Sequence, residues 1–425
     1  MPIRAWFRIA FVNVALLYCG LFGINLYLEH ARWYPTAERA ERRRVEATAR
    51  AVDARYFAQC LAKDYLQLMY PDLISHQQRF RDLAKKNRFL PLGAVPHAKT
   101  VYCNEGYGFA SYTSDRFGFR NPDHNWNQAV DVLIVGDSFV QGACVPDPLT
   151  FSRQLSNDLG INALNVGTGS NGPNHYRHLI ETFAPLTKPR HVVLTVFPND
   201  NVAIPDGDPY SATPAEVNRA NYSMAGVSAA GQAFYDEVRP LLAPSPDALI
   251  DPIDCRAADL TFPVLRPIIA RDHAAGGSNA SLAKFVEHLH GTVGTIRRLS
   301  VLRALRASLV AQSAPQAPVL ASPDATRAAL DAVFAQCADG CEPVIVFLPT
   351  STYWRPDPRS DAYFAFVEAY LRTSHGGKSW RRLDARTLID DGSLSDYAPT
   401  GGHYSTDAYR RIGRALGRVI ERRVP

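Results

Sequence analysis

The stretch AVDVLIVGDS, residues 129–138, decides the fold of this chain because a largely apolar run ends directly in a polar turn. Its β-branched residues favour a strand, and a strand that is apolar along most of its length is typical of a sheet covered on both faces. A serine on the turn between such a strand and a helix presents its hydroxyl at the edge of the sheet. Ser138 is therefore the first candidate nucleophile.

Further apolar runs of this kind follow along the chain, with helical spacing between them. Strands are predicted at residues 163–166, 191–196 and 343–349, and helices at 151–159, 175–183, 361–371 and 406–422. Apolar strands that alternate with helices indicate a parallel sheet with helices on both faces. The sequence therefore predicts a three-layer α/β fold, in which ligands bind beyond the carboxyl ends of the strands.

Candidate site residues follow these strands in order. A glycine-rich segment at 167–172 comes after the second strand, Asn199 after the third, and His403 in a loop before the last helix. Backbone N–H groups and a carboxamide are donors of the kind that stabilise an oxyanion. An imidazole is the base that a serine needs near neutral pH. Each signal alone reads as a turn or a cap, but their joint placement at strand ends predicts a hydrolytic site.

Together these segments resemble the SGNH/GDSL hydrolase superfamily, whose members have a flavodoxin-like three-layer α/β fold and carry Ser, Gly, Asn and His in four blocks. The resemblance covers about residues 114–202 and 343–422. It implies that Ser138 is the nucleophile and that His403 is the general base. The residues that it implies for the oxyanion hole are Ser138, Gly169 or Ser170, and Asn199.

The sequence departs from the family pattern at the acid. Members of the family carry an aspartate two or three residues before the histidine, where this chain has Gly401 and Thr400. An orienting carboxylate is worth about 10⁴ in rate where one is used. Asp396, Asp391, a backbone carbonyl or no partner at all, which would leave a Ser–His dyad, remain open as alternatives. A smaller departure is Ser170, which stands where the family has a glycine.

Residues 9–28 form an apolar segment of twenty residues without a charged side chain. At about 1.5 Å per residue a helix of this length spans roughly 30 Å, the thickness of the hydrocarbon core of a bilayer. The alternative is a cleaved signal peptide, which would have a shorter apolar run and a small-residue cleavage site that this segment lacks. We expect an uncleaved, single-pass N-terminal transmembrane helix that anchors the chain in a membrane.

Six cysteines follow the apolar segment, an even number that fits disulfide bonds in an oxidising compartment. They are Cys60, Cys103, Cys144, Cys255, Cys337 and Cys341. Buried thiols are an alternative that the sequence leaves open. None forms a CxxC pair and no histidine stands at zinc spacing, so neither a metal ion nor another cofactor is expected. We expect the main domain to lie outside the cytoplasm, as in a periplasmic protein.

The chain divides by composition into four parts. They are an anchor at 1–35, a charged helical stalk and lead-in at 36–112, a hydrolase-like domain at 113–203 and 336–425, and an insertion at 204–335. The insertion is rich in proline and then in helical segments. We expect it to be helical and able to cap the site.

The composition is that of a globular protein, with 46% hydrophobic and 20% charged residues and a net charge of +5. The sequence has no basic stripe with interleaved aromatic residues, so nucleic acid is not an expected partner. The resemblance implies hydrolysis of ester-linked acyl groups on a small molecule or an envelope polysaccharide. Alternatives are a carbohydrate O-acyltransferase of the same fold, a non-catalytic envelope scaffold and a phospholipase.

Overall fold

The computed structural model describes most of the chain beyond its first 36 residues. The described residues are 37–201, 207–244, 246–249, 252–255, 260–275, 320–338, 340–351, 358–390 and 393–421, together with Asn13 and Gly20. The chain divides into two compact units, one made of residues 1–44 and 267–319 and the other of residues 45–266 and 320–425. The α/β fold and the candidate site both lie in the second unit.

The predicted membrane anchor cannot be compared with the structure, because residues 9–28 lie outside the described residues except for Asn13 and Gly20. Within the part of the chain that is described, no helix is long and apolar enough to cross a membrane. Much of the predicted helical insertion, residues 276–319, also lies outside the described residues. The anchor and the character of that part of the insertion therefore stay predictions.

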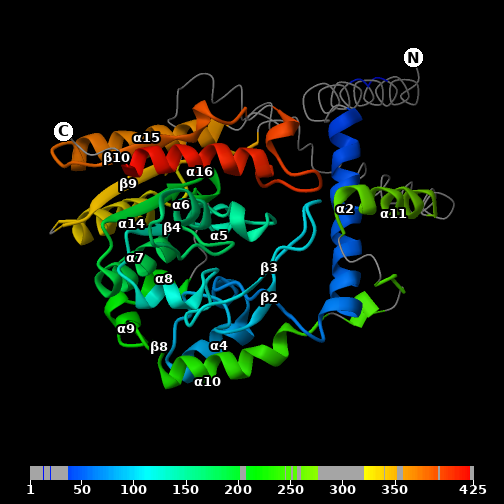
Figure 1. Cartoon of the computed structure of the whole chain (residues 1–425), viewed down its shortest axis with the longest axis horizontal. Coiled ribbons are helices and arrows are strands. Elements are labelled where there is room, and N and C mark those ends of the chain that lie inside the picture. Colours follow the sequence, from blue (N-terminus) through cyan, green and yellow to red (C-terminus); the bar gives the residue numbers. More distant parts are fainter. Residues whose placement is uncertain are drawn as a thin grey trace, which may run out of the picture. The chain divides into compact units, whose positions relative to one another are not determined.

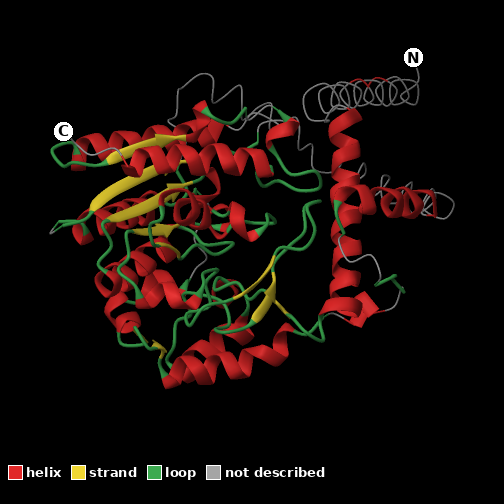
Figure 2. Cartoon of the chain, in the orientation of Figure 1, coloured by secondary structure: helices red, strands yellow, loops and turns green. Residues whose placement is uncertain are grey.

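A parallel five-stranded sheet forms the centre of the fold (Figures 1 and 2). Its strands are β4 (Val132–Val135), β5 (Ala163–Asn165), β6 (His191–Val196), β9 (Glu342–Phe347) and β10 (Arg381–Asp384). Every neighbouring pair is parallel, in the order β10-β9-β6-β4-β5. Numbered along the chain, this order is 2-1-3-4-5, which is that of flavodoxin-like doubly wound sheets. The predicted α/β class with a parallel sheet is confirmed.

The order of strands also identifies where a ligand is expected. In doubly wound sheets, ligands bind at the point where the chain reverses its direction of travel across the sheet. Here β4 pairs with β5 on one side and with β6 on the other, so that point lies between β4 and β6. Ser138 follows β4 and Asn199 follows β6, so both residues lie at this crevice.

Helices cover both faces of the sheet, as the apolar strands require. One face packs against α7 (Pro173–Thr187), α14 (Pro323–Gln336) and α15 (Pro358–His375), and the other packs against α6 (Phe151–Leu159) and α16 (Thr406–Glu421). Successive side chains of a strand point to opposite faces. In β4, Leu133 and Val135 accordingly join the first core, and Val132 and Ile134 join the second. The strand β10 escaped prediction because it is short and begins with two arginines.

The segment predicted as stalk and lead-in contributes to the same compact unit from Val45 onward. It contains α2 (Ala37–Tyr56), the π-helical turn η1 (Phe57–Leu61), α3 (Leu73–His76), α4 (Gln78–Asn87) and a small sheet of β1 (Leu66–Gln67), β2 (Lys99–Val101) and β3 (Ser111–Thr113). Ile74 and Phe80 are buried in the core that covers the first face of the sheet. The segment is therefore more than a solvated stalk, because its apolar residues complete the core.

Further helices and a hairpin connect these parts. The helices are α5 (Ser138–Gln141), α8 (Pro209–Ala212), α9 (Ala215–Arg219), α10 (Ala229–Val238) and α11 (Phe262–Ala275), and the hairpin is β7 (Tyr222–Ser223) with β8 (Gly226–Val227). Single turns of 3-10 helix are η2 (Asp123–Asn127), η3 (Asp147–Leu149), η4 (Pro198–Asp200), η5 (Arg239–Leu242), η6 (Pro246–Leu249), η7 (Ala385–Thr387) and η8 (Leu394–Asp396).

All six cysteines beyond the apolar segment form disulfide bonds. The pairs are Cys60–Cys255, Cys103–Cys144 and Cys337–Cys341. Of the two alternatives that the sequence left open, the structure therefore shows disulfides and not free thiols. The pairing was beyond the reach of the sequence, since six cysteines allow fifteen connectivities.

Candidate active site

The turn after β4 places Ser138 at the edge of the sheet. Ser138 is the first residue of α5, and the side chain of Asp137 accepts a hydrogen bond from the Phe139 N–H at 3.0 Å, which caps this short helix. Position 136 has no room for a side chain, because a Cβ on Gly136 would lie 2.0 Å from the Thr195 hydroxyl oxygen. A tight strand-to-helix turn is thus built as the sequence predicted.

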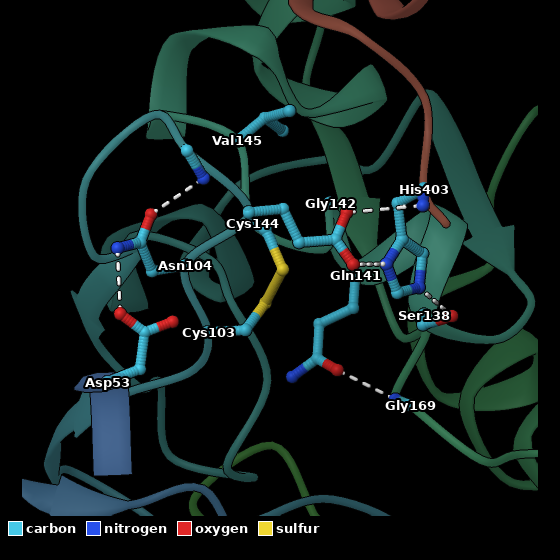
Figure 3. The surroundings of a disulfide bond; sticks show 12 residues. Asp53, Cys103, Asn104, Ser138, Gln141, Gly142, Cys144, Val145, Gly169 and His403 are labelled. Carbon is cyan, nitrogen blue, oxygen red and sulfur yellow. Dashed lines mark hydrogen bonds and ion pairs between the residues drawn. A yellow bond between two sulfur atoms is a disulfide. The ribbon is translucent and has the colours of Figure 1, made fainter. Parts of the chain in front are cut away.

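His403 lies against this serine. Its Nε2 is 2.9 Å from the Ser138 Oγ, although the two residues are 265 positions apart in the chain (Figure 3). The ring of Phe139 lies beside the imidazole, with 4.9 Å between the ring centroids. The structure therefore brings together the two residues that the sequence predicted as nucleophile and base.

The carboxylate that orients His403 belongs to Glu105. Its Oε1 lies 2.8 Å from the His403 Nδ1, and its Oε2 accepts a hydrogen bond from the His403 backbone N–H at 3.1 Å. An ionised carboxylate only accepts hydrogen bonds, so Nδ1 carries the proton and Nε2 is free to accept the proton of Ser138. Glu105, His403 and Ser138 therefore have the geometry of an acid–base–nucleophile triad.

Gly401 explains why the family's usual acid position is empty here. A Cβ at position 401 would lie 1.8 Å from Cδ and 2.0 Å from Oε1 of Glu105. The Thr400 N–H also donates a hydrogen bond to the Glu105 carbonyl oxygen at 3.1 Å. The carboxylate of Glu105 therefore fills the space that an aspartate at position 401 would need.

Of the two acids considered from the sequence, only Asp396 can be compared with this geometry. Asp396 is buried, accepts a hydrogen bond from the Asp390 N–H at 2.7 Å and is ion-paired with Arg411. It is therefore a structural residue that supports the loop before α16, and the prediction that it orients the imidazole is wrong. Asp391 lies outside the described residues. Sequence reasoning missed Glu105 because it lies 298 positions from His403, in a segment outside the resemblance.

Burial and charge shift the pKa values of His403 and Glu105 in opposite directions. Burial would lower the pKa of His403, but the charge and the hydrogen bond of Glu105 outweigh it and raise the pKa above its ordinary value. Burial would likewise raise the pKa of Glu105, but the charge and hydrogen bonds of His403 lower it below its ordinary value. Each residue therefore stabilises the charged form of the other, as an imidazolium intermediate requires.

The sequence left two backbone amides, those of Gly169 and Ser170, as alternatives for one donor of the oxyanion hole. The Gly169 N–H is already engaged, because it donates to the Gln141 Oε1 at 2.7 Å (Figure 3). No acceptor for the Ser170 N–H is found among the described residues, and Ser170 has the left-handed backbone (φ 63°) that glycine adopts most easily. Of the two candidates, Ser170 is therefore the donor that this geometry leaves available.

Asn199 and the Ser138 amide complete the set of donors. One N–H of the Asn199 carboxamide donates to the Asp137 Oδ2 at 3.1 Å, which fixes the orientation of the side chain and leaves its second N–H free of that contact. The Ser138 N–H is in the first turn of α5 and has no acceptor within the helix. These groups lie at the carboxyl ends of β4 and β6, where the sequence placed them.

A cavity of about 680 Å³ opens in front of the triad. Ser138, His403, Glu105, Ser170 and Asn199 all line it. Its other walls come from Arg50, Asp53 and Phe57, from Tyr70 and Tyr102, and from Pro244 and Ala248. A cavity of this size is in the range that holds small ligands. The lead-in and the start of the predicted insertion therefore both contribute to the site.

One group of potential metal ligands coincides with the triad. Ligand atoms of Glu105, Cys144 and His403 lie within 4.8 Å of one another. Cys144 is bonded to Cys103, so its sulfur is not a thiolate, and the other two groups are hydrogen-bonded to each other. With the disulfide formed, these three groups are therefore poor ligands for a metal ion.

Comparisons with known proteins include a distant structural likeness. No protein-family model and no curated protein matches the chain. Among solved structures, the chain is similar to a protein of Desulfitobacterium hafniense DCB-2 that is provisionally assigned to the G-D-S-L family of lipolytic proteins. The two are 13% identical with a TM-score of 0.31, and the match covers 68% of this chain and 99% of that one. A likeness this distant says nothing about activity, so the resemblance to SGNH/GDSL hydrolases rests on the strand order and on the site.

Proposed function

We propose that this chain is a serine esterase that cleaves ester-linked acyl groups. The observation that supports it best is the line of contacts from Glu105 to His403 at 2.8 Å and from His403 to Ser138 at 2.9 Å. This line lies beside the donors of an oxyanion hole, at the ligand-binding edge of a doubly wound sheet.

The geometry supports a two-step reaction. In the first step, His403 Nε2 takes the proton of Ser138 while Oγ attacks the ester carbonyl carbon, and the negative charge moves to the carbonyl oxygen. The amides of Ser138 and Ser170 and the side chain of Asn199 hold that oxygen. The imidazolium, stabilised by Glu105, then gives its proton to the departing alcohol oxygen, which leaves an acyl ester on Ser138.

The second step uses the same groups in reverse. His403 takes a proton from water, the hydroxide oxygen attacks the acyl carbon, and the proton returns to the Ser138 Oγ as the carboxylic acid leaves. A sugar hydroxyl in place of that water would make the chain an acyltransferase. Product analysis with an added sugar acceptor separates the two, since transfer yields an acylated sugar and hydrolysis yields free acid.

The substrate class is proposed from the cavity and the predicted location. The lining of the cavity includes the aromatic residues Phe57, Tyr70 and Tyr102 together with the charged residues Arg50 and Asp53. Such a wall suits an acylated polar molecule better than a long hydrocarbon chain. With the proposed anchor at residues 9–28, an acylated envelope polysaccharide or a smaller acylated compound would reach the site from outside the cytoplasm.

The test compares wild type with Ser138→Ala on 4-nitrophenyl acetate and on acetylated sugars. We expect a burst of nitrophenol and turnover in the wild type and neither in the variant, together with fluorophosphonate labelling at Ser138. Equal background rates in the two proteins would instead favour a non-catalytic scaffold.

A further inference from the structure

Glu105 lies on a short loop that a disulfide bond ties to the nucleophile. We call residues 103–106 the acid loop and residues 136–145 the nucleophile loop. Cys103, two positions before Glu105, is bonded to Cys144, which follows α5 and Ser138 by a few residues (Figure 3). The bond therefore crosses from the segment that supplies the acid to the segment that supplies the serine.

The nucleophile loop is held firmly on its own side of this bond. The guanidinium of Arg120, whose side chain is 1% exposed, donates to the carbonyl oxygens of Gly142 at 2.7 Å and Val145 at 3.0 Å. These two acceptors flank Cys144. The side chain of Gln141 also donates to the Tyr112 hydroxyl at 2.9 Å. Cys144 is therefore a fixed point relative to Ser138.

The acid loop is tied mainly to other parts of the chain. The Asn104 side chain donates to Asp53 on α2 at 3.0 Å and to the Leu260 carbonyl at 2.7 Å. The Gly106 carbonyl accepts from the Phe262 N–H at 2.8 Å. These contacts hold the loop to α2 and to residues 260–262, whereas the disulfide leads to the nucleophile loop.

We propose that Cys103 and Cys144 are positioning residues, whose disulfide holds Glu105 in line with His403 and Ser138. This inference rests on the proposed function, because it concerns the orientation of the same triad. Misplacement of a catalytic group by about 1 Å can cost about 10²-fold in rate. Opening the bridge frees the acid loop from the nucleophile loop, and the contact between Glu105 and His403 weakens.

The bridge opens by a defined chemical change. A dithiol reductant supplies two electrons and two protons, the S–S bond breaks to give two thiols, and the reductant is oxidised to its own disulfide. Activity is therefore expected to fall when the Cys103–Cys144 pair is reduced, which agrees with the expected location outside the cytoplasm.

The first experiment removes the bridge by the double substitution Cys103→Ser and Cys144→Ser in the full chain. We expect kcat to fall about tenfold or more with KM little changed, because the loss lies in the orientation of the base. The midpoint of the acidic limb of kcat/KM should also move to lower pH, because Glu105 then raises the pKa of His403 less. A bridge that merely stabilised the fold would leave this midpoint unchanged.

The matched control removes the bridge Cys337–Cys341 by the double substitution Cys337→Ser and Cys341→Ser. These residues lie between α14 and the start of β9, at the amino edge of the sheet, whereas the site lies at the carboxyl edge. We expect kcat and the pH midpoint of this variant to match the wild type. Both variants are assayed well below their unfolding temperatures.

A second readout keeps this inference apart from the proposed function. The pKa of His403, measured from its ring signals by NMR, needs no turnover. If the wild type cleaved no ester, the esterase proposal would be refuted. A His403 pKa that is nevertheless lower in the variant without the bridge would still support the positioning role. Unchanged kcat, pH midpoint and His403 pKa without the bridge would overturn the inference.

If the double variant does not fold, the wild type is used instead. The concentration of dithiol reductant is raised in steps, and an aliquot of each step is alkylated with iodoacetamide so that mass spectrometry reports the state of each bridge. Circular dichroism of the unalkylated protein checks that it stays folded. Activity that falls in proportion to this one bridge and returns on reoxidation supports the inference. Full activity with both cysteines reduced contradicts it.

Discussion

The carboxylate of Glu105 occupies the space in which a side chain at position 401 would lie, since a Cβ on Gly401 would be 1.8 Å from the Glu105 Cδ. The acid of the triad therefore comes from the lead-in, and the loop that carries His403 has a glycine where an aspartate would be expected. The two positions are sterically coupled. A side chain at position 401 is tolerated only when a smaller residue at position 105 makes room for it.

Removing the charge of Glu105 tests its role directly. We expect Glu105→Gln to lower kcat by about 10³–10⁴-fold with little effect on KM, because the amide favours the wrong tautomer of His403. The control is Asp396→Asn, which also replaces a carboxylate by an amide. Asp396 pairs with Arg411, away from the imidazole, so this variant should lose stability and keep kcat within a few-fold. An Asp396→Asn variant as inactive as Glu105→Gln would refute the assignment.

The steric coupling predicts a rescue. Gly401→Asp alone should destabilise the protein by about 1–3 kcal/mol, because two side chains then compete for one space. In the Glu105→Ala background the same substitution should restore kcat by at least about tenfold over Glu105→Ala, since it supplies a carboxylate where one is missing. The control is Gly402→Asp, whose Cβ meets no atom within 4 Å. Equal rescue by Gly402→Asp would show that any nearby charge suffices.

The pH dependence of activity follows from the raised pKa of His403. The base must be neutral to accept the proton of Ser138, so kcat/KM should rise with pH through one ionisation. Its midpoint should lie above the ordinary imidazole value of 6.5, because the charge of Glu105 outweighs burial. In Glu105→Gln the midpoint should move to lower pH. Rate profiles of both proteins measure this, and a midpoint that moves upward would contradict the ion pair.

The same pair makes stability depend on pH. The contribution of His403, whose folded pKa is raised, is fully present below 6.5 and is lost as pH rises through the folded value. The contribution of Glu105, whose folded pKa is lowered, is fully present above 4.5 and is lost as pH falls through the folded value. The difference in unfolding free energy between wild type and Glu105→Gln should thus be largest between pH 4.5 and 6.5. Urea titrations across this range would show it, and a difference that does not vary with pH would argue against the pair.

Asn199 is expected to act in the transition state. Asn199→Ala should lower kcat by about 10²–10³-fold, because one oxyanion donor is lost and KM depends little on it. Asn201 is the control, since its side chain accepts a hydrogen bond from the Ala321 N–H and does not line the cavity. Asn201→Ala should keep its activity. Steady-state kinetics of both variants measure this, and an equal loss of kcat in Asn199→Ala and Asn201→Ala would contradict the role of Asn199.

Local patterns in the sequence predicted the sheet and two members of the triad. The strand β6 and the helix α6 have the bounds that apolar spacing gave them, because side chains in a covered sheet or on a helix face repeat with a fixed period. Ser138 could be predicted for the same reason, since its turn directly follows an apolar strand. The glycine-rich segment follows β5 as the sequence predicted, but the hydrogen bond from Gly169 to Gln141 depends on packing.

By itself, the sequence of this protein determined an α/β sheet, a serine at its edge and a histidine before the last helix. Only the tertiary structure decided that Glu105 is the acid, that Cys103 pairs with Cys144, and that Ser170 is the available amide donor. The physical reason is that strands and turns are set by neighbours in the chain. A carboxylate need only reach one point in space, and any segment that folds to that point can supply it.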